Sequence, residues 1–443
     1  MSHAETHDNA IRIHRCHADT ANGDGSHQPS VAAVTHRRRD YSPGCLMPPI
    51  TRAPERPPRI TIVSMSELSD VLSAIESLSA RGQRLALATI VAVSGSTYRR
   101  PGARLLVPEE GDLVGNISGG CLENDVADVA KIVMSEGVAR IVSFDLTADD
   151  DAVWGWGLGC NGAFELFVEP ADKAAEVAGA LRMALEEERP IAMVTVLDST
   201  VPNVEQGDRL LVKPGGQAER SFGDEALDRA AREAALELLG AERSEVRTLA
   251  GSEGEARAFV EVLEPPLRLL VCGAGHDAAP LVEAAANLGW SPIVVDDRPE
   301  FLNRTRFPNA ADFVLVERPD KVAETAPLDA RTHVVVMSHN FLRDKDYLRS
   351  LLTSPVRFIA MLGPAVRTQR LLTELRDEGV DISEADLSRI RGPAGLDLGA
   401  EGAEEIAAAI VAEIVAVKRG RGAGFLKDRP GPIHERRAAQ PMA

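Results

Sequence analysis

Two cysteines lie in glycine-rich stretches where a thiol could take part in chemistry. Cys121 follows Ser118-Gly119-Gly120, and hydrophobic residues then recur at three- and four-residue spacing, which predicts that a helix begins there. Unpaired backbone N–H groups and the helix dipole lower the pKa of a thiol at such a position, and they make it a better nucleophile or metal ligand. A small residue that merely packs against the turn gives the same pattern, so the stretch alone leaves both interpretations open.

Cys160 lies in a second glycine-rich stretch together with Trp154 and Trp156. Indole rings in a loop either stack on a flat heterocycle or fill a groove. A third polar loop carries Arg99 and Arg100, whose guanidinium groups suit a phosphate. Two cysteines are too few for a closed zinc site. The three loops together predict a site for a flat, phosphate-bearing ligand with affinity for sulfur.

The second half of the chain carries a dinucleotide-binding pattern. Gly273-Ala274-Gly275-His276-Asp277 follows a strand-like hydrophobic run and precedes a helical pattern, so the glycines allow a tight turn and close approach of a pyrophosphate. Asp296 follows about 20 residues later, where a carboxylate commonly binds ribose. Two plain alternatives remain: His276 and Asp277 only cap the helix, or the fold holds another ligand or none.

His339 follows a strand-like run that ends at Met337. Open α/β sheets bind ligands at the carboxyl ends of their strands, and histidine is a natural acid or base, so His339 is a catalytic candidate. A loop histidine that only hydrogen-bonds to the backbone fits equally well.

The elements that position these residues predict an α/β protein with two different halves. The N-terminal half reads as a mixed α/β domain with glycine-rich cysteine loops. From Leu267 strands and helices alternate, which predicts a Rossmann-like, doubly wound parallel sheet. The predicted divisions are a disordered extension 1–64, an N-terminal domain 65–170, a middle α/β segment 171–264, the Rossmann-like domain 265–420 and a mobile tail 421–443.

Length, charge and cysteine content limit the function classes. A chain of 443 residues predicts two or three domains, and its net charge of −18 argues against nucleic acid as the main partner. We find no hydrophobic run long enough to span a membrane and no signal-peptide pattern. Five cysteines are no disulfide framework, so a reducing cytoplasm is expected. Structure is predicted to begin near Met65, which we also take as a hypothetical translation start.

Several motifs in one order resemble the XdhC/CoxI family, whose members are accessory proteins of molybdenum hydroxylases such as xanthine dehydrogenase and carbon monoxide dehydrogenase. The resemblance covers roughly residues 65–435. It leaves residues 1–60 without a counterpart, and the middle segment offers no motif to compare. The motifs are Gly95-Ser96-Thr97-Tyr98-Arg99-Arg100-Pro101-Gly102-Ala103, Ser118-Gly119-Gly120-Cys121-Leu122-Glu123, Gly155-Trp156-Gly157-Leu158-Gly159-Cys160-Asn161-Gly162, Gly273-Ala274-Gly275-His276-Asp277, Val295-Asp296, Ser338-His339-Asn340-Phe341, Leu362-Gly363-Pro364 and Gly395-Leu396-Asp397-Leu398-Gly399-Ala400.

The resemblance implies a chaperone rather than a classical enzyme. Family members are thought to bind molybdenum cofactor (molybdopterin), to protect it while it is sulfurated and to deliver it to an apo molybdenum hydroxylase. Cys121 would then be a molybdenum contact or sulfur relay, with Cys160 second. Ser118, Gly119, Gly120 and the two arginines would bind the cofactor, and the two tryptophans would flank it. A cysteine desulfurase or sulfurtransferase is an implied partner, and a homodimer is typical.

Two other function classes stay open. An NAD(P)-dependent oxidoreductase would use the Rossmann motif and His339 as its acid or base. A scaffold that recruits a sulfurtransferase to the hydroxylase would bind its partners without any cysteine. Neither the client hydroxylase nor the oligomeric state can be derived from these motifs.

Overall fold

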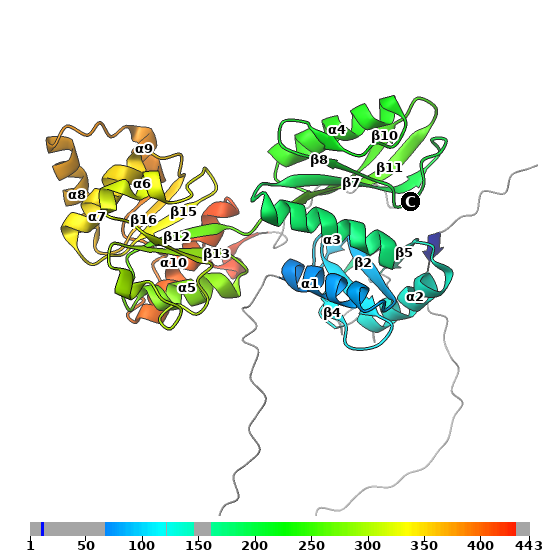
Figure 1. The fold of residues 1–443 in the computed structure, drawn as a ribbon, viewed down its shortest axis with the longest axis horizontal. Coiled ribbons are helices and arrows are strands. Elements are labelled where there is room, and N and C mark those ends of the chain that lie inside the picture. The colour runs from blue at the N-terminus through cyan, green and yellow to red at the C-terminus, as the bar shows by residue number, and fades with distance from the viewer. Residues whose placement is uncertain (1–9, 13–66, 121, 146–160, 431–443) are drawn as a thin grey trace, which may run out of the picture. The chain divides into compact units, whose positions relative to one another are not determined.

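The computed structural model describes residues 10–12, 67–120, 122–145 and 161–430 (Figure 1). Its strands form three sheets, and the last of these is parallel throughout. The predicted fold class, a mixed α/β N-terminal half followed by a Rossmann-like doubly wound sheet, is confirmed.

The first sheet has the strand order β1-β5-β6-β2-β3-β4. Strand β1, in the N-terminal extension, runs parallel to β5, and all other neighbours are antiparallel. The elements of residues 67–170, here called repeat 1, are α1 (Glu67–Ala80), β2 (Leu85–Ser96), β3 (Arg104–Pro108), β4 (Val114–Gly115), α2 (Glu123–Glu136), β5 (Arg140–Asp145) and β6 (Asn161–Pro170), with β1 at Ala10–Arg12.

The second sheet is antiparallel, with the order β10-β11-β7-β8-β9. Its elements follow one another as those of repeat 1 do: a helix, three strands, a helix and two strands. Residues 171–263, here called repeat 2, hold α3 (Ala171–Glu186), β7 (Ile191–Ser199), β8 (Arg209–Val212), β9 (Ala218–Glu219), α4 (Glu225–Gly240), β10 (Glu245–Ala250) and β11 (Glu255–Leu263).

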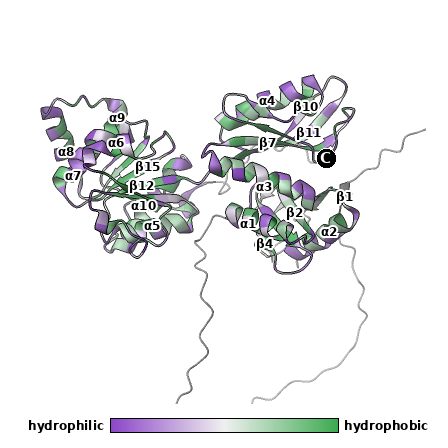
Figure 2. Cartoon of the chain, in the orientation of Figure 1, coloured by the Kyte–Doolittle hydropathy of each residue, from purple (hydrophilic) through white to green (hydrophobic). Residues whose placement is uncertain are grey.

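Hydrophobic cores lie on both faces of these two sheets. Helix α2 packs on one face of the first sheet and α4 on one face of the second. The remaining faces share cores with each other and with α1 and α3, through residues such as Phe167 and Phe259. Figure 2 shows hydrophobic and hydrophilic residues alternating along α4 and α7, as expected of helices that bury one face.

The third sheet has the order β14-β13-β12-β15-β16-β17, which is the Rossmann arrangement with β12 as its first strand. Its strands are runs of β-branched and other hydrophobic residues, as buried parallel strands usually are. They are β12 (Arg268–Cys272), β13 (Ser291–Asp296), β14 (Asp312–Leu315), β15 (His333–Val336), β16 (Phe358–Met361) and β17 (Ile390–Arg391).

Helices cover both faces of this sheet. Helices α5 and α10 pack on one face, and α6, α7 and α8 on the other (Figure 1). The helices are α5 (Ala278–Asn287), α6 (Val322–Thr325), α7 (Phe341–Leu352), α8 (Ala365–Asp377), α9 (Glu384–Arg389) and α10 (Ala403–Lys418), with short 3-10 helices at Pro299–Phe301, Pro319–Lys321 and Leu426–Asp428.

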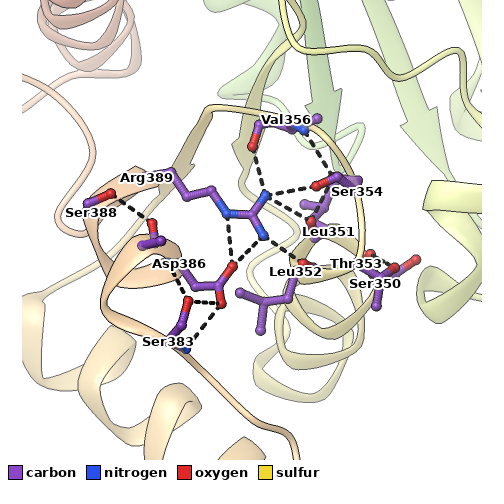
Figure 3. A network of polar contacts seen from close by, with 11 residues as sticks. Ser350, Leu351, Leu352, Thr353, Ser354, Val356, Ser383, Asp386, Ser388 and Arg389 are labelled. Carbon is purple, nitrogen blue, oxygen red and sulfur yellow. Dashed lines mark hydrogen bonds and ion pairs between the residues drawn. The ribbon is translucent and has the colours of Figure 1, made fainter.

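Arg389 at the end of α9 fastens this helix to the end of α7 (Figure 3). Its guanidinium group donates hydrogen bonds to the backbone carbonyls of Leu352 at 2.6 Å and Val356 at 2.7 Å, and also to those of Leu351 and Ser354. Asp386 pairs with the same group at 2.7 Å. One side chain therefore binds four carbonyls at and just beyond the end of α7.

Two absences among the described residues bear on the predictions. No helix of the described ranges is long and hydrophobic enough to cross a bilayer. Within the same ranges, no group of three or more metal-ligating side chains gathers at one point.

Candidate functional site

Two of the predicted N-terminal loops, the arginine loop and the glycine turn, lie at one end of the first sheet. Strands β2 and β6 are antiparallel, and Ser96 at the end of β2 pairs with Asn161 at the start of β6. Asp145, the last residue of β5, pairs with Ala163. The arginine loop leaves β2 at this end, and the stretch that ends with Cys160 joins β6 there.

Tyr98 brings the arginine loop against the glycine turn that precedes α2. A Cβ atom placed on Gly119 would lie 3.7 Å from two carbon atoms of the Tyr98 ring. The ring itself is 65% exposed. At Gly120 the backbone has a positive φ of 110°, and a Cβ atom there would meet nothing within 4 Å. The two loops thus border an open surface next to an exposed aromatic ring.

Ser118 and Glu123 hold the turn in shape. The Glu123 carboxylate accepts hydrogen bonds from the Ser118 backbone N–H at 3.0 Å and hydroxyl at 2.5 Å, and from the Leu122 N–H at 3.1 Å. Burial alone would raise the pKa of Glu123, but these hydrogen bonds outweigh it and hold the pKa below its usual value. The turn is therefore rigid and carries a carboxylate of its own.

The structure describes some of the candidate residues predicted in this half and not others. Ser118 is buried, Arg99 is half-buried, and Arg100, Gly119 and Gly120 are exposed at the described end of the sheet. Cys121, Trp154, Trp156 and Cys160 lie outside the described residues. Sequence reasoning missed Tyr98 as a candidate; its place beside the two arginines was the signal that could have drawn attention to it.

The fit to a flat, anionic group rests on this arrangement. The backbone N–H groups of Gly119 and Leu122 already donate to the side chains of Asn116 and Ser118, so they do not point at a ligand. A phosphate would depend on the two arginines, while the exposed ring of Tyr98 offers a face to a planar ring system. These residues fit a pterin-like ligand, with Cys121 adjacent in the sequence.

A second candidate site lies in the Rossmann-like part, at the switch point between β12 and β15. Gly273 has a φ of +115°, and a Cβ atom there would come within 2.8 Å of the Met337 backbone, so only glycine fits. The glycine loop therefore packs tightly on the segment that carries His339. The glycine motif lies between a strand and a helix of a Rossmann-like sheet, as the sequence predicts.

Asp277 and His339 form a pair in this crevice. Nε2 of His339 lies 2.5 Å from Oδ2 of Asp277, and His339 has a positive φ of 57°. The other carboxylate oxygen, Oδ1, is buried without a hydrogen-bond partner and lies 2.7 Å from where a Cβ atom of Gly275 would stand. The carboxylate thus occupies the space over Gly275 that a pyrophosphate would need. His276 beside it is exposed.

Asp296 is almost fully buried, and both of its oxygens are engaged. Oδ2 accepts a hydrogen bond from the Ala274 N–H at 2.7 Å, and the Arg298 guanidinium pairs with both oxygens at 2.7 and 2.9 Å. Burial opposes ionisation, but the bonds to Arg298 and Ala274 hold the pKa of Asp296 below its usual value. In this arrangement Asp296 stabilises the glycine loop, and a ribose could reach it only after Arg298 moved.

Comparisons with known proteins agree with both halves. A family model described as the XdhC and CoxI family matches residues 78–145 and 184–250, and one described as the XdhC Rossmann domain matches residues 269–414. A Bacillus subtilis protein named as a probable xanthine dehydrogenase subunit is 30% identical over 75% of this chain and 93% of its own length.

Two further relatives extend this comparison. The molybdenum cofactor insertion chaperone PaoD of Escherichia coli is 23% identical over 78% of this chain and 86% of its own. A crystal structure titled as a xanthine dehydrogenase from Bacillus halodurans matches with a TM-score of 0.64 and 28% identity, over 83% of this chain and 98% of that one.

Proposed function

Because this chain belongs to the XdhC and CoxI family, we propose that it binds molybdenum cofactor and delivers it to an apo molybdenum hydroxylase. A relative named as a molybdenum cofactor insertion chaperone supports this role. The observation that carries the proposal is the meeting of the arginine loop, the Tyr98 ring and the open glycine turn at one end of the first sheet.

Each of these groups has a distinct task in the proposal. Arg99 and Arg100 bind the phosphate of the cofactor, and Tyr98 stacks on the pterin. Cys121, next to the turn, contacts molybdenum or carries sulfur, because thiolates are soft ligands and good sulfur carriers. Cys160, Trp154 and Trp156 belong to the stretch that joins β6 at the same end. A sulfurtransferase that supplies the sulfur and a homodimeric state are further parts of the proposal.

The chemistry of the chain in this role is protective. The bound cofactor supplies the molybdenum centre, and the residues of the chain hold its phosphate, cover its ring and keep water from its sulfur. The turn held by Glu123 leaves Gly120, where a Cβ atom would meet nothing within 4 Å, open to the ligand.

The test is the amount of pterin that the purified chain retains. Pterin is released by oxidation and measured by fluorescence for the wild type and for Cys121→Ser. We expect the pterin content of the variant to be at least about tenfold lower than that of the wild type, since the loss of one metal–thiolate contact or its supporting shell lowers affinity that much. It should also fail to activate the apo-hydroxylase.

A matched control is Cys272→Ala. Burial raises the pKa of the Cys272 thiol far above its usual value, so this cysteine is a poor nucleophile and should leave pterin retention unchanged. Normal pterin content and normal activation with Cys121→Ser would refute the assigned role. NADH is titrated in parallel, because the order of the third sheet makes a dinucleotide the second candidate ligand. NADH turnover without bound pterin would favour the oxidoreductase instead.

A further inference from the structure

The first two sheets share sequence as well as element order. Gly102-Ala103-Arg104-Leu105-Leu106-Val107 enters β3, and Gly207-Asp208-Arg209-Leu210-Leu211-Val212 enters β8. Phe167-Val168-Glu169 in β6 recurs as Phe259-Val260-Glu261 in β11. The XdhC and CoxI family model matches the same span of each, from the end of α1 to β5 and from the end of α3 to β10. Repeats 1 and 2 are therefore two versions of one unit.

The buried positions of the two repeats correspond. Ile117 and Leu122 of repeat 1 match Phe222 and Leu227 of repeat 2, in the two cores that lie on α2 and α4. In the core between the sheets, Phe167 lies together with its counterpart Phe259. Residues that face their own counterparts place an approximate two-fold axis through this core.

Two buried ion pairs cross between the repeats reciprocally. Arg104 of repeat 1 pairs with Glu261 of repeat 2 at 2.5 Å, and its counterpart Arg209 pairs with Glu169, the counterpart of Glu261. All four side chains are at most 4% exposed. This exchange of equivalent partners is what a two-fold contact between identical units produces.

The candidate ligand residues fall where the repeats differ. When Gly102 is aligned with Gly207 and Leu122 with Leu227, the two arginines of the loop in repeat 1 align with an uncharged and an acidic residue in repeat 2. The glycine turn and its cysteine align with the acidic start of α4. The replacements are Val204 for Arg99, Glu205 for Arg100, Asp224 for Gly119, Glu225 for Gly120 and Ala226 for Cys121. Residues 251–254 join β10 to β11, where repeat 1 has the longer segment 146–160.

We propose that repeat 1 alone binds the ligand, that repeat 2 is its scaffold, and that Glu261 of repeat 2 positions the arginine loop of repeat 1. Glu261 reaches the end of that loop twice. Its Oε1 lies 2.9 Å from where a Cβ atom of Gly102 would stand, and Arg104, which it pairs with, donates to the Gly102 carbonyl at 2.9 Å. The ligand assigned here is the molybdopterin of the proposed function, and this inference rests on that function.

The chain contains its own control for this proposal. Glu169 does for repeat 2 what Glu261 does for repeat 1: Arg209 pairs with it and donates to the Gly207 carbonyl at 3.3 Å. The loop that Glu169 supports, residues 200–207, carries no arginine. Substitution of either glutamate removes the ion pair with the equivalent arginine, but only Glu261 also lies against the glycine of its loop and supports the candidate site.

The experiment compares Glu261→Gln with Glu169→Gln in the full chain. Pterin per chain is measured by oxidative release and fluorescence. We expect one pterin per wild-type chain, at least a tenfold loss in Glu261→Gln and wild-type content in Glu169→Gln. Two pterins per chain, or equal losses in the two variants, would overturn the proposal.

Hydrogen exchange provides a readout that needs no ligand. The Gly102 N–H donates to the Ile90 carbonyl at 2.8 Å, and the Gly207 N–H donates to the Val196 carbonyl at the same distance. Glu261→Gln should speed exchange at Gly102 and not at Gly207, and Glu169→Gln should do the reverse. If the wild type holds no pterin, the proposed function fails, and unchanged exchange at Gly102 in Glu261→Gln would show separately that the positioning is wrong.

A second pair of variants covers the case in which the buried substitutions prevent folding. Gly102→Ala and Gly207→Ala impose similar backbone strain, since the φ angles are +93° and +89°. Only the methyl group at 102 meets the glutamate, whereas the one at 207 lies 3.6 Å from the Lys173 side chain. Pterin loss confined to Gly102→Ala supports the proposal, and equal loss in both contradicts it.

Discussion

At the scale of single residues, Tyr98 is the described side chain best placed to face a flat ligand. Its ring lies against Gly119 of the glycine turn, and the residue is 65% exposed, so the ring is accessible to a planar ligand. We expect Tyr98→Ala to lower pterin retention about tenfold, which corresponds to the ~0.5–1.5 kcal/mol of an aromatic pair plus its buried area. Tyr98→Phe should retain pterin, because stacking needs the ring and not the hydroxyl.

The control for this substitution is Phe425→Ala, which removes another exposed ring, 77% accessible, outside the candidate site. Pterin content should then match the wild type. A Tyr98→Phe variant that loses as much pterin as Tyr98→Ala would assign the effect to the hydroxyl and count against stacking.

His333 makes the stability of the Rossmann-like part depend on pH. Burial lowers the pKa of His333 below its ordinary value of 6.5, against a hydrogen bond to the Arg331 carbonyl that raises it. The neutral form is therefore favoured in the folded state. Its stability contribution is complete above pH 6.5 and is lost as the pH falls through the lowered pKa. Each unit of difference in pKa is worth about 1.4 kcal/mol.

Urea denaturation between pH 7.5 and pH 5 measures this effect. The free energy of unfolding of His333→Asn should fall less with acidification than that of the wild type. Parallel curves for the two proteins would contradict the prediction. His339, exposed and paired with Asp277, provides a variant for comparison in the same part of the chain.

The sequence predicts which residue types could form the candidate sites, but not the contacts that these residues make. The sequence predicts that the arginine loop and the glycine turn belong to one site, and the structure adds that the Tyr98 ring lies against Gly119 of the turn. The contacts of Asp296 could not be predicted, because the Ala274 N–H becomes its neighbour only once β12 and β13 pair, and the sequence does not show that the nearby Arg298 side chain turns back onto it. The pairing of Asp277 with His339 could not be predicted either, because the two residues are far apart in the sequence and meet only in the folded sheet.

At the scale of elements, agreement follows the strength of the periodic pattern. The hydrophobic periodicity of the sequence predicts helices at 341–352 and 365–377, and α7 and α8 have these bounds, because each buries a clear hydrophobic stripe. Strand β10 was not predicted, since it lies at the edge of its sheet and buries only Leu249, so it has no hydrophobic run. The short hydrophobic run at 113–117 predicts a strand, but only Val114–Gly115 forms one, since Ile117 already belongs to the turn.

Arg389 offers a test of how α9 is attached. Arg389→Lys keeps the charge but cannot reach four carbonyls with one ammonium group, so we expect a loss of about 2–4 kcal/mol in the free energy of unfolding. The measurement is chemical denaturation of the full chain followed by circular dichroism.

The control for Arg389 is Arg370→Ala, which removes an exposed ion pair with Glu374 one helical turn away. Such pairs contribute about 0.3–0.5 kcal/mol, so this variant should unfold almost as the wild type does. A similar small change with Arg389→Lys would show that water satisfies the carbonyls at the end of α7.

At the scale of the whole molecule, the internal repeat escaped sequence reasoning. Only two short runs, Gly-x-Arg-Leu-Leu-Val and Phe-Val-Glu, survive in both copies. Core positions kept their hydrophobic character but changed in size, as Ile117 and Phe222 show. Packing accepts such exchanges when total volume is preserved, so structure retains a duplication after most sequence similarity is lost.

The reciprocal ion pairs predict a characteristic pattern of stabilities. Removal of one charge, as in Glu169→Leu, leaves the buried Arg209 without its counter-charge and should lower the free energy of unfolding by about 3–5 kcal/mol. Replacement of both, Glu169→Leu with Arg209→Met, should restore most of that loss, because hydrophobic residues of similar volume can replace a buried pair. Denaturant midpoints of the wild type, of Glu169→Leu, of Arg209→Met and of the double variant measure this. A double variant as unstable as the sum of its single variants would contradict it.

The carboxylate of Asp277 has a consequence for any ligand of the Rossmann crevice. It lies over Gly275, where a phosphate group would stand, and His339 holds it there. A ligand phosphate at Gly275 would have to displace this carboxylate, and the free energy of that displacement would raise the apparent dissociation constant of the ligand. A ligand that also engages His339 would offset part of this loss.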